Sequence, residues 1–268
     1  MSNIAKAFDN NKGKALDNNK GKAFIGFVTG GDPSIEKTKE FILEMFRAGS
    51  DLVEIGIPFS DPIAEGPVIQ EANIRALRAG ATVEKLFALV EDVRKATDAP
   101  LVFLTYLNPV FHYGYDAFFK RCEAVGLDGI IIPDLPFEEQ ADVRETSSKY
   151  GVDLISLIAP TSEARIKEIA KTASGFIYLV SSMGVTGVRS EITTDVASIA
   201  ASVKSVTELP VAVGFGIHTP AQAREMARVA DGVIVGSAIV KIVAEHGEDA
   251  GSRIYQYVSE MKKAILTG

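Results

Sequence analysis

The chain has 268 residues, of which 47% are hydrophobic and 24% are charged, and its formal net charge is -7. This composition is typical of a soluble protein with a large core, and the length is within the range of a one-domain α/β protein. The negative charge argues against a general nucleic-acid surface and against attraction to anionic lipid. No apolar run approaches the ~20 residues of a membrane span, and the N-terminus lacks the apolar segment of a signal peptide. We therefore expect a cytoplasmic protein that binds neither nucleic acid nor membrane.

Residues 1–21 are predicted to form an N-terminal arm. They contain a tandem octapeptide, KAFDNNKG (6–13) followed by KALDNNKG (14–21). Two copies are too few, and each is too short, for a repeat architecture, and the Asn-Asn-Lys-Gly segments favour turns. We expect this arm to be solvated and to lie outside the core, so that residues 22–268 form a single folded domain.

From Lys22 onward, strand patterns alternate with helical patterns. Eight strands are predicted, at residues 24–28, 52–57, 101–106, 129–133, 154–158, 176–180, 211–214 and 232–236. Apolar residues at helical spacing fill the gaps, and a last helix carries Ile254, Val258 and Met261 on one face, outside the barrel. Eight strand–helix units predict a single-domain α/β protein, a closed (βα)8 TIM barrel with an extra N-terminal arm and additional helices.

The stretch DLVEIGIPFSDPIAEGPVIQ (51–70) contains two unusual carboxylates. Its first half predicts a strand buried on both faces, and Glu54 interrupts the apolar run. A carboxylate there is costly unless it is paired, solvated or protonated. A structural ion pair is the alternative, but no Lys or Arg lies inside the other predicted strands to form it. We therefore predict catalysis at Glu54, next to a proline-rich loop that carries Asp61 and Glu65.

Three glycine-containing turns follow the last three predicted strands: SSMGVTG (181–187), GFG (214–216) and GSAIVK (236–241). Active sites of such barrels lie at the carboxyl ends of the strands. Glycines let backbone N–H groups approach an anion, and Ser237 adds a hydroxyl at the positive end of a helix. Each glycine alone is explained by a turn, but their joint position predicts a phosphate site. No dinucleotide-binding or P-loop motif occurs.

Apolar and aromatic residues at or near the strand ends would form the wall of a pocket for a flat aromatic substrate. They are Phe27, Leu104, Tyr106, Ile131, Tyr178 and Phe215. Barrel filling is the default explanation for most of them. The histidines, His112, His218 and His246, show no ligand spacing, so no metal site is expected. What remains is carboxylate acid–base catalysis on a phosphorylated compound.

The motifs FVTGGDP, EIGIPFSDPIAEGP, GVTG, VAVGFGI and GSAIVK, in this order, resemble the tryptophan synthase alpha subunit. The resemblance implies retro-aldol cleavage of indole-3-glycerol phosphate to indole and glyceraldehyde 3-phosphate, a lyase reaction of tryptophan biosynthesis. Glu54 corresponds to the family's acid–base glutamate. Glu65 corresponds to an aspartate of the family's usual ADGP segment, which hydrogen-bonds the indole N–H, so the carboxylate here is one methylene longer.

The resemblance also implies roles for residues near the other strand ends. Tyr178 corresponds to a substrate-contacting tyrosine, and Thr186 to the threonine of a mobile loop that closes over the site. The residues implied to hold the phosphate are Gly187, Gly216, Gly236 and Ser237.

The resemblance further implies a beta-subunit partner, in an allosteric alpha2-beta2 heterotetramer. Pyridoxal phosphate is expected only in that partner, and no cofactor is expected in this chain. The segments 58–62, 108–111 and 134–136 correspond to family surfaces that face the beta subunit. Because Glu65 departs from the family pattern, a second hypothesis stays open: a catalytically weak, ligand-binding regulatory subunit that activates a beta partner.

Overall fold

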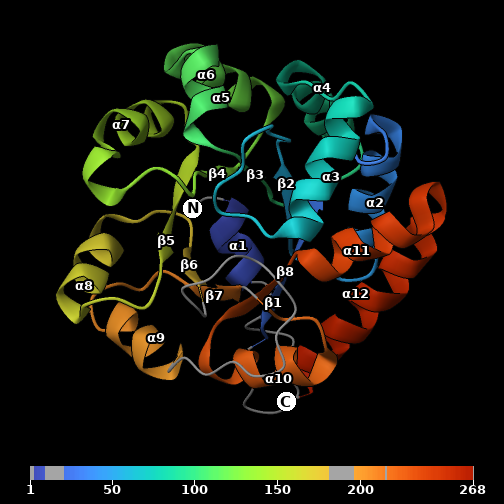
Figure 1. Cartoon of the computed structure of the whole chain (residues 1–268). Coiled ribbons are helices and arrows are strands. Elements are labelled where there is room, and N and C mark those ends of the chain that lie inside the picture. The colour runs from blue at the N-terminus through green and yellow to red at the C-terminus, as the bar shows by residue number, and fades with distance from the viewer. Residues whose placement is uncertain (1–2, 10–20, 181–195, 215, 268) are drawn as a thin grey trace.

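The computed structural model describes residues 3–9, 21–180, 196–214 and 216–267. Eight parallel strands close into a barrel in chain order, β1 to β8 (Figure 1). They are β1 (Ala23–Thr29), β2 (Leu52–Gly56), β3 (Leu101–Leu104), β4 (Gly129–Ile131), β5 (Asp153–Ile158), β6 (Ile177–Val180), β7 (Val211–Gly214) and β8 (Gly232–Val235). The predicted eight-stranded barrel is confirmed, and the strand ends shift by one or two residues at most.

Helices surround the barrel in the part of the chain that is described. They are α1 (Asn3–Asp9), α2 (Ile35–Arg47), α3 (Pro67–Arg78), α4 (Val83–Arg94), α5 (Leu107–Tyr113), α6 (Tyr115–Val125), α7 (Ala141–Lys149), α8 (Glu163–Thr172), α9 (Val196–Lys204), α10 (Pro220–Val229), α11 (Ser237–His246) and α12 (Gly251–Leu266), with short 3-10 turns at Phe137–Glu139 and Gly247–Ala250. Side chains of Ser34, Thr82 and Ser162 cap α2, α4 and α8 by accepting backbone N–H bonds, which satisfies donors that a helix start leaves unpaired. As predicted, the last helix, α12, packs outside the barrel, against α2 and α10.

The core has two layers, because successive strand residues point to opposite faces of the sheet. One set of side chains packs between the strands and the surrounding helices. The other set fills the barrel interior and comprises Ile4, Phe8, Ala23, Ile25, Leu52, Val102, Ile131, Ile155, Phe176, Tyr178, Ala212 and Ile234. This interior layer supports the carboxyl end of the barrel from below.

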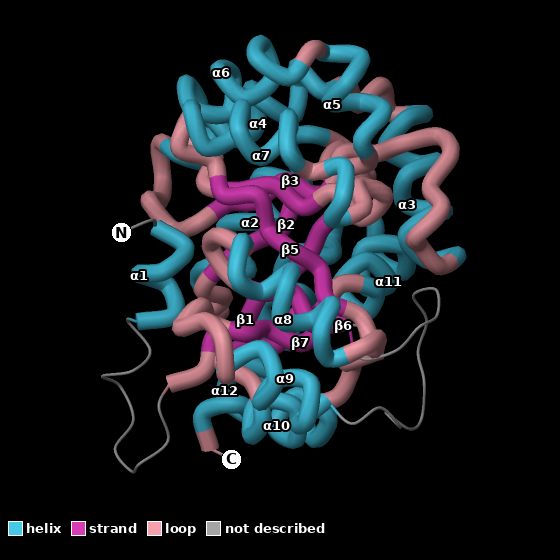
Figure 2. Tube along the Cα trace, turned by 90° about the vertical axis from the view of Figure 1, so that its left-hand side faces the viewer, coloured by secondary structure: helices cyan, strands magenta, loops and turns pink. Residues whose placement is uncertain are grey.

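Helix α1 closes the amino end of the barrel, on the opposite side from α3 and α11 (Figure 2). Ile4 and Phe8 lie on one face of the helix, four residues apart, and both are buried. Ile4 lies against Gly129 at the start of β4, and Phe8 lies against Gly232 at the start of β8. The Phe8 ring also contacts the Phe176 ring, with 5.7 Å between the centroids.

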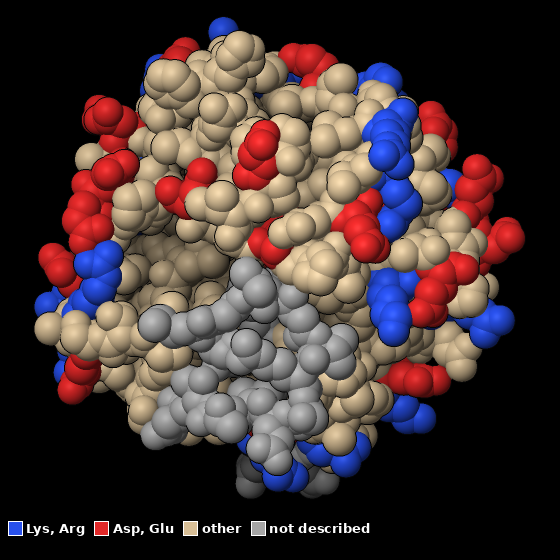
Figure 3. All heavy atoms as spheres, viewed as in Figure 1, with Lys and Arg blue, Asp and Glu red and all other residues tan. Residues whose placement is uncertain are grey.

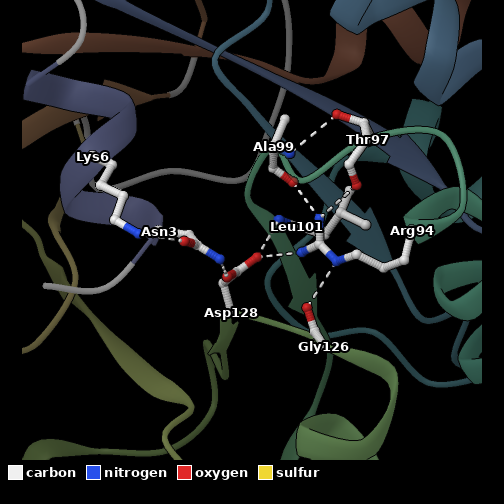
Figure 4. Close-up of polar contacts among 8 residues, drawn as sticks. All are labelled: Asn3, Lys6, Arg94, Thr97, Ala99, Leu101, Gly126 and Asp128. Carbon is white, nitrogen blue, oxygen red and sulfur yellow. Dashed lines mark hydrogen bonds and ion pairs between the residues drawn. The ribbon is translucent and has the colours of Figure 1, made fainter.

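Polar contacts join α1 to the segments before β3 and β4 (Figure 4). Asn3 Nδ2 donates to Asp128 Oδ1 at 2.9 Å. The other oxygen of Asp128 accepts from Leu101 N at 2.9 Å and pairs with the Arg94 guanidinium. Arg94 Nε in turn donates to Gly126 O at 2.9 Å. Asp128 therefore connects α1, α4 and β3.

The expectation that residues 1–21 lie outside the core is wrong for residues 3–9. That expectation was based on the turn-forming asparagines. They come after residues 3–9 in the sequence, so they do not predict whether Ile4 and Phe8 are buried. Residues 10–20, which include most of the second octapeptide copy, lie outside the described residues.

We predict that Phe8→Ala lowers the free energy of unfolding by about 3 kcal/mol, because it removes a buried ring and leaves a cavity at the amino end. Urea denaturation followed by circular dichroism measures the change. Lys6→Ala is the matched control, since Lys6 lies on the exposed side of α1, and it should alter stability by less than about 0.5 kcal/mol. Equal stability of the two variants would show that α1 contributes nothing to the core.

Candidate active site

The carboxyl ends of the strands lie on the side of the barrel away from α1, and they face the viewer in Figures 1 and 3. On this face, charged side chains lie mostly around the periphery (Figure 3). A hollow lined by residues other than Lys, Arg, Asp and Glu opens left of the centre. This is the end at which barrels of this type build their sites.

Glu54 lies in the middle of β2, paired in the register of the sheet with Phe27 on β1 and Val102 on β3. It is 1% exposed, and within the described residues its Oε1 atom has no hydrogen-bond partner. Burial raises the pKa of its carboxyl to about 8, because the charged form loses its hydration. An ion pair would have lowered this pKa, so the geometry favours a carboxyl that is protonated at neutral pH and able to donate its proton.

Tyr178 on β6 points into the same interior and is buried with the residues of the inner layer. Burial raises the pKa of its phenol well above the usual value, and the nearby charge of Glu54 raises it further. The structure therefore brings Tyr178 and Glu54 together, with the phenol held in its protonated form.

Two glycines make room for the aromatic side chains of the site. A Cβ atom on Gly56 would lie 2.7 Å from Phe27 Cζ, and one on Gly214 would lie 2.4 Å from Tyr178 Oη. Any larger residue would displace these rings. Sequence reasoning assigned Gly214 to a phosphate turn and gave Gly56 no role. The signal in the sequence was a glycine at an inward-facing strand position, which often marks a place where another group comes close to the backbone.

Glu65 lies in the loop that leads from β2 to α3. The loop is held by Tyr106, whose Oη accepts a hydrogen bond from Ala64 N at 3.0 Å and whose ring contacts Phe59, with 5.3 Å between the centroids. The Glu65 side chain is held separately, because its Oε2 accepts a hydrogen bond from Asn73 Nδ2 of α3 at 2.7 Å. Tyr106 and Asn73 thus fix the loop and its carboxylate from two elements.

The environment of Glu65 tunes its ionisation. Burial raises the pKa of its carboxyl to about 7, and the Asn73 hydrogen bond acts in the opposite direction. Both Glu54 and Glu65 therefore titrate near neutral pH, which is typical of functional carboxyls. Sequence reasoning missed Asn73, although an amide among the buried residues Ile69, Ala72 and Ala76 of α3 is a signal of its own.

The predicted pocket wall is only partly described. Phe27 packs with residues of α3 and α11 at the carboxyl end, and Leu104 contacts both this group and the inner layer. Ile131 is completely buried in the inner layer, as barrel filling also requires. Phe215 and Thr186 lie outside the described residues.

Three of the four predicted phosphate residues are described. Gly216 has a positive φ of 79°, a conformation that favours glycine. Gly236 precedes α11 and Ser237 is its first residue, so the positive end of this helix opens beside the site. A Cβ atom on Gly236 would lie 3.5 Å from Phe27, so this helix start adjoins the pocket wall. Gly187 lies outside the described residues.

Within the described residues, no cluster of three or more His, Cys, Asp and Glu side chains is arranged to hold a metal ion. In the same ranges, no helix is both long enough and apolar enough to cross a membrane. The arrangement that the structure does present is acid–base: two carboxyls with raised pKa values beside an apolar wall and a helix start.

We predict that Glu54→Gln stabilises the protein relative to the wild type as the pH rises. The Glu54 carboxyl loses its proton near pH 4.5 when unfolded and near pH 8 when folded, so the folded wild type binds the extra proton between these values and loses stability as the pH rises through them. The loss is at most about 1.4 kcal/mol per pH unit. Melting temperatures of both proteins from pH 5 to 8 test this, and parallel curves would contradict it.

The profile of the family described as "Tryptophan synthase alpha chain" matches residues 14–266. The tryptophan synthase alpha chain of Lactiplantibacillus plantarum is 52% identical over 99% of this chain and 97% of its own length. The structure of Mycobacterium tuberculosis tryptophan synthase superposes with a TM-score of 0.89 at 34% identity, covering 100% of both chains.

A structure of the tryptophan synthase α2β2 complex from Pyrococcus furiosus superposes with a TM-score of 0.80 at 34% identity, covering 89% of this chain and 97% of that chain. The sequence similarity extends over nearly the whole chain, and the solved structures have the same fold. The chain belongs to the tryptophan synthase alpha chain family.

Proposed function

We propose that this chain is a carbon–carbon lyase that cleaves indole-3-glycerol phosphate to indole and glyceraldehyde 3-phosphate in tryptophan biosynthesis. The family assignment supports the reaction. The observation that carries the mechanism is the Glu54 carboxyl. It is buried at an inward-facing strand position, one of its oxygens has no hydrogen-bond partner among the described residues, and its pKa is about 8.

Glu54 first acts as an acid. Its proton is transferred to the indole ring carbon that carries the glycerol phosphate chain, and the ring becomes positively charged. The resulting carboxylate then accepts the proton of the adjacent hydroxyl while the carbon–carbon bond breaks and its electrons return to the ring. One proton leaves Glu54 and one returns, so the residue is ready for another cycle.

Glu65 acts on the other side of the ring. As a carboxylate it accepts a hydrogen bond from the indole N–H and stabilises the positive charge that develops there. Its pKa of about 7 leaves a substantial ionised fraction at neutral pH. The longer side chain, compared with the aspartate implied by the family pattern, is accommodated by the loop that Tyr106 and Asn73 hold.

The remaining site residues bind the substrate. The indole ring lies against Phe27, Leu104, Tyr106, Ile131, Tyr178 and Phe215. The phosphate is held by Gly187, Gly216, Gly236 and Ser237, where backbone N–H groups and the α11 dipole favour an anion. Thr186 belongs to a loop that closes over the substrate and excludes water.

We further propose that the chain works in the cytoplasm with a beta subunit, as an alpha2-beta2 heterotetramer, and that pyridoxal phosphate is bound by the partner and not by this chain. The α2β2 complex of the Pyrococcus furiosus relative supports this assembly. Exposed apolar side chains, Ile63 (74%) and Phe111 (69%), lie in or beside the segments 58–62 and 108–111 and would be covered by the partner.

We predict that Glu54→Gln lowers turnover at least about a hundredfold, because the amide keeps the shape of the side chain and cannot exchange a proton. The affinity for indole-3-glycerol phosphate should stay within a few-fold of the wild type. Indole release, with and without the beta subunit, measures turnover, and calorimetry measures binding. Turnover at the wild-type rate would refute the role assigned to Glu54.

We predict that Glu65→Asp changes turnover by less than about tenfold, because a small shift of the loop can bring either carboxylate to the indole N–H. Glu65→Ala should lose about a hundredfold or more, since it removes the charge that stabilises the ring. The test measures turnover of the wild type, Glu65→Asp and Glu65→Ala with the beta subunit present. If Glu65→Ala matched the wild type, the chain would instead fit the hypothesis of a catalytically weak regulatory subunit.

A further inference from the structure

Asn73 is an unusual residue for its place on α3. It is 3% exposed and lies among the buried apolar residues of that helix, where an alanine or leucine would ordinarily pack. A buried side-chain amide is costly unless its hydrogen bonds are made. The bond from its Nδ2 to Glu65 Oε2, at 2.7 Å, connects this amide to the carboxylate of the site.

The backbone and the side chain of Glu65 are held by different residues of α3. Gln70 Nε2 donates to Glu65 O at 2.8 Å, whereas Asn73 Nδ2 donates to the carboxylate itself. Gln70 is exposed and Asn73 is buried. The backbone contact therefore lies in water, and the carboxylate contact lies in a drier setting, where a hydrogen bond is stronger.

We infer that Asn73 is a positioning residue, whose amide holds the Glu65 carboxylate in the orientation that serves the cleavage reaction. This inference rests on the proposed function. A glutamate has one more rotatable bond than an aspartate, so an unheld carboxylate would sample more positions, and a displacement of ~1 Å can cost on the order of a hundredfold in rate. Asn73 does not touch the reacting atoms and acts only through Glu65.

The groups around Glu65 affect its pKa, so the pH dependence of kcat can report whether Asn73 acts on this carboxyl. The Asn73 bond lowers the pKa of Glu65 against the effect of burial. From the segment after β3, Tyr106 faces Glu65, and burial together with the charges of Glu65 and Asp134 raises the pKa of its phenol to about 12, so this phenol stays protonated. Without Asn73, the pKa of Glu65 should rise, and the acidic limb of the pH–kcat profile should move to higher pH.

The test measures indole release by the full chain with the beta subunit present. Asn73→Ala should lower kcat about tenfold or more, change KM less than about threefold, and shift the acidic limb upward. Asn73→Asp keeps the size of the side chain but places a second carboxyl beside Glu65, so it should shift the limb further upward. Gln70→Ala is the matched control. It should keep kcat within about twofold of the wild type and leave the acidic limb at the same pH.

A double-mutant cycle separates positioning from a structural effect. In the Glu65→Ala background, Asn73→Ala should cause no more than about a twofold further loss, because the group on which it acts is gone. If Asn73→Ala lowered kcat in the Glu65→Ala background as much as it does in the wild type, the inference about Asn73 would be wrong. The same holds if Asn73→Ala alone kept the kcat and the acidic limb of the wild type. Neither result would contradict the proposed function. Absence of indole release by the wild type would overturn the proposed function, and the inference with it.

Discussion

The burial of one carboxyl group, that of Glu54, is the constraint on which the rest of the site depends. An acidic side chain at an inward-facing position of a closed barrel loses its water and stays protonated at neutral pH. Phe27 pairs with Glu54 in the register of the sheet, and Tyr178 lies close enough for the charge of Glu54 to affect its phenol. Two glycines, Gly56 and Gly214, leave the space that these two rings need. The protein gives up stability to keep an acid there, as functional sites commonly do.

Most of the fold could be predicted from the sequence, because each strand of the barrel is a local apolar run and each helix a local periodic pattern. The third strand was predicted to reach Tyr106 but ends at Leu104, since Tyr106 precedes α5 and its hydroxyl holds the loop before α3. Helix α1 could not be predicted as part of the core. Whether Ile4 and Phe8 are buried depends on the starts of β4 and β8, which are distant in the sequence.

The site could be predicted where its signal was local. Glu54 stands out as an acidic residue in an apolar run, and Glu65 follows it in a proline-rich loop. The contact between Glu65 and Asn73 could not be predicted, because it depends on the path of that loop and on the start of α3. The glycines that accommodate aromatic rings are likewise explained only by three-dimensional packing. The roles of all the site residues stay predictions, and Thr186, Gly187 and Phe215 lie outside the described residues.

In the part of the chain that the structure describes, α1 covers the amino end of the barrel. Within the described residues, Ile4, Phe8 and Phe176 pack together in the barrel interior toward the amino end, which favours access of water and protons to Glu54 from the carboxyl ends of the strands. A substrate bound at those ends would then shield Glu54 from the solvent. Under the proposed mechanism, the proton that Glu54 gives leaves with the indole, and the proton that Glu54 takes from the hydroxyl would exchange with solvent once the products have departed.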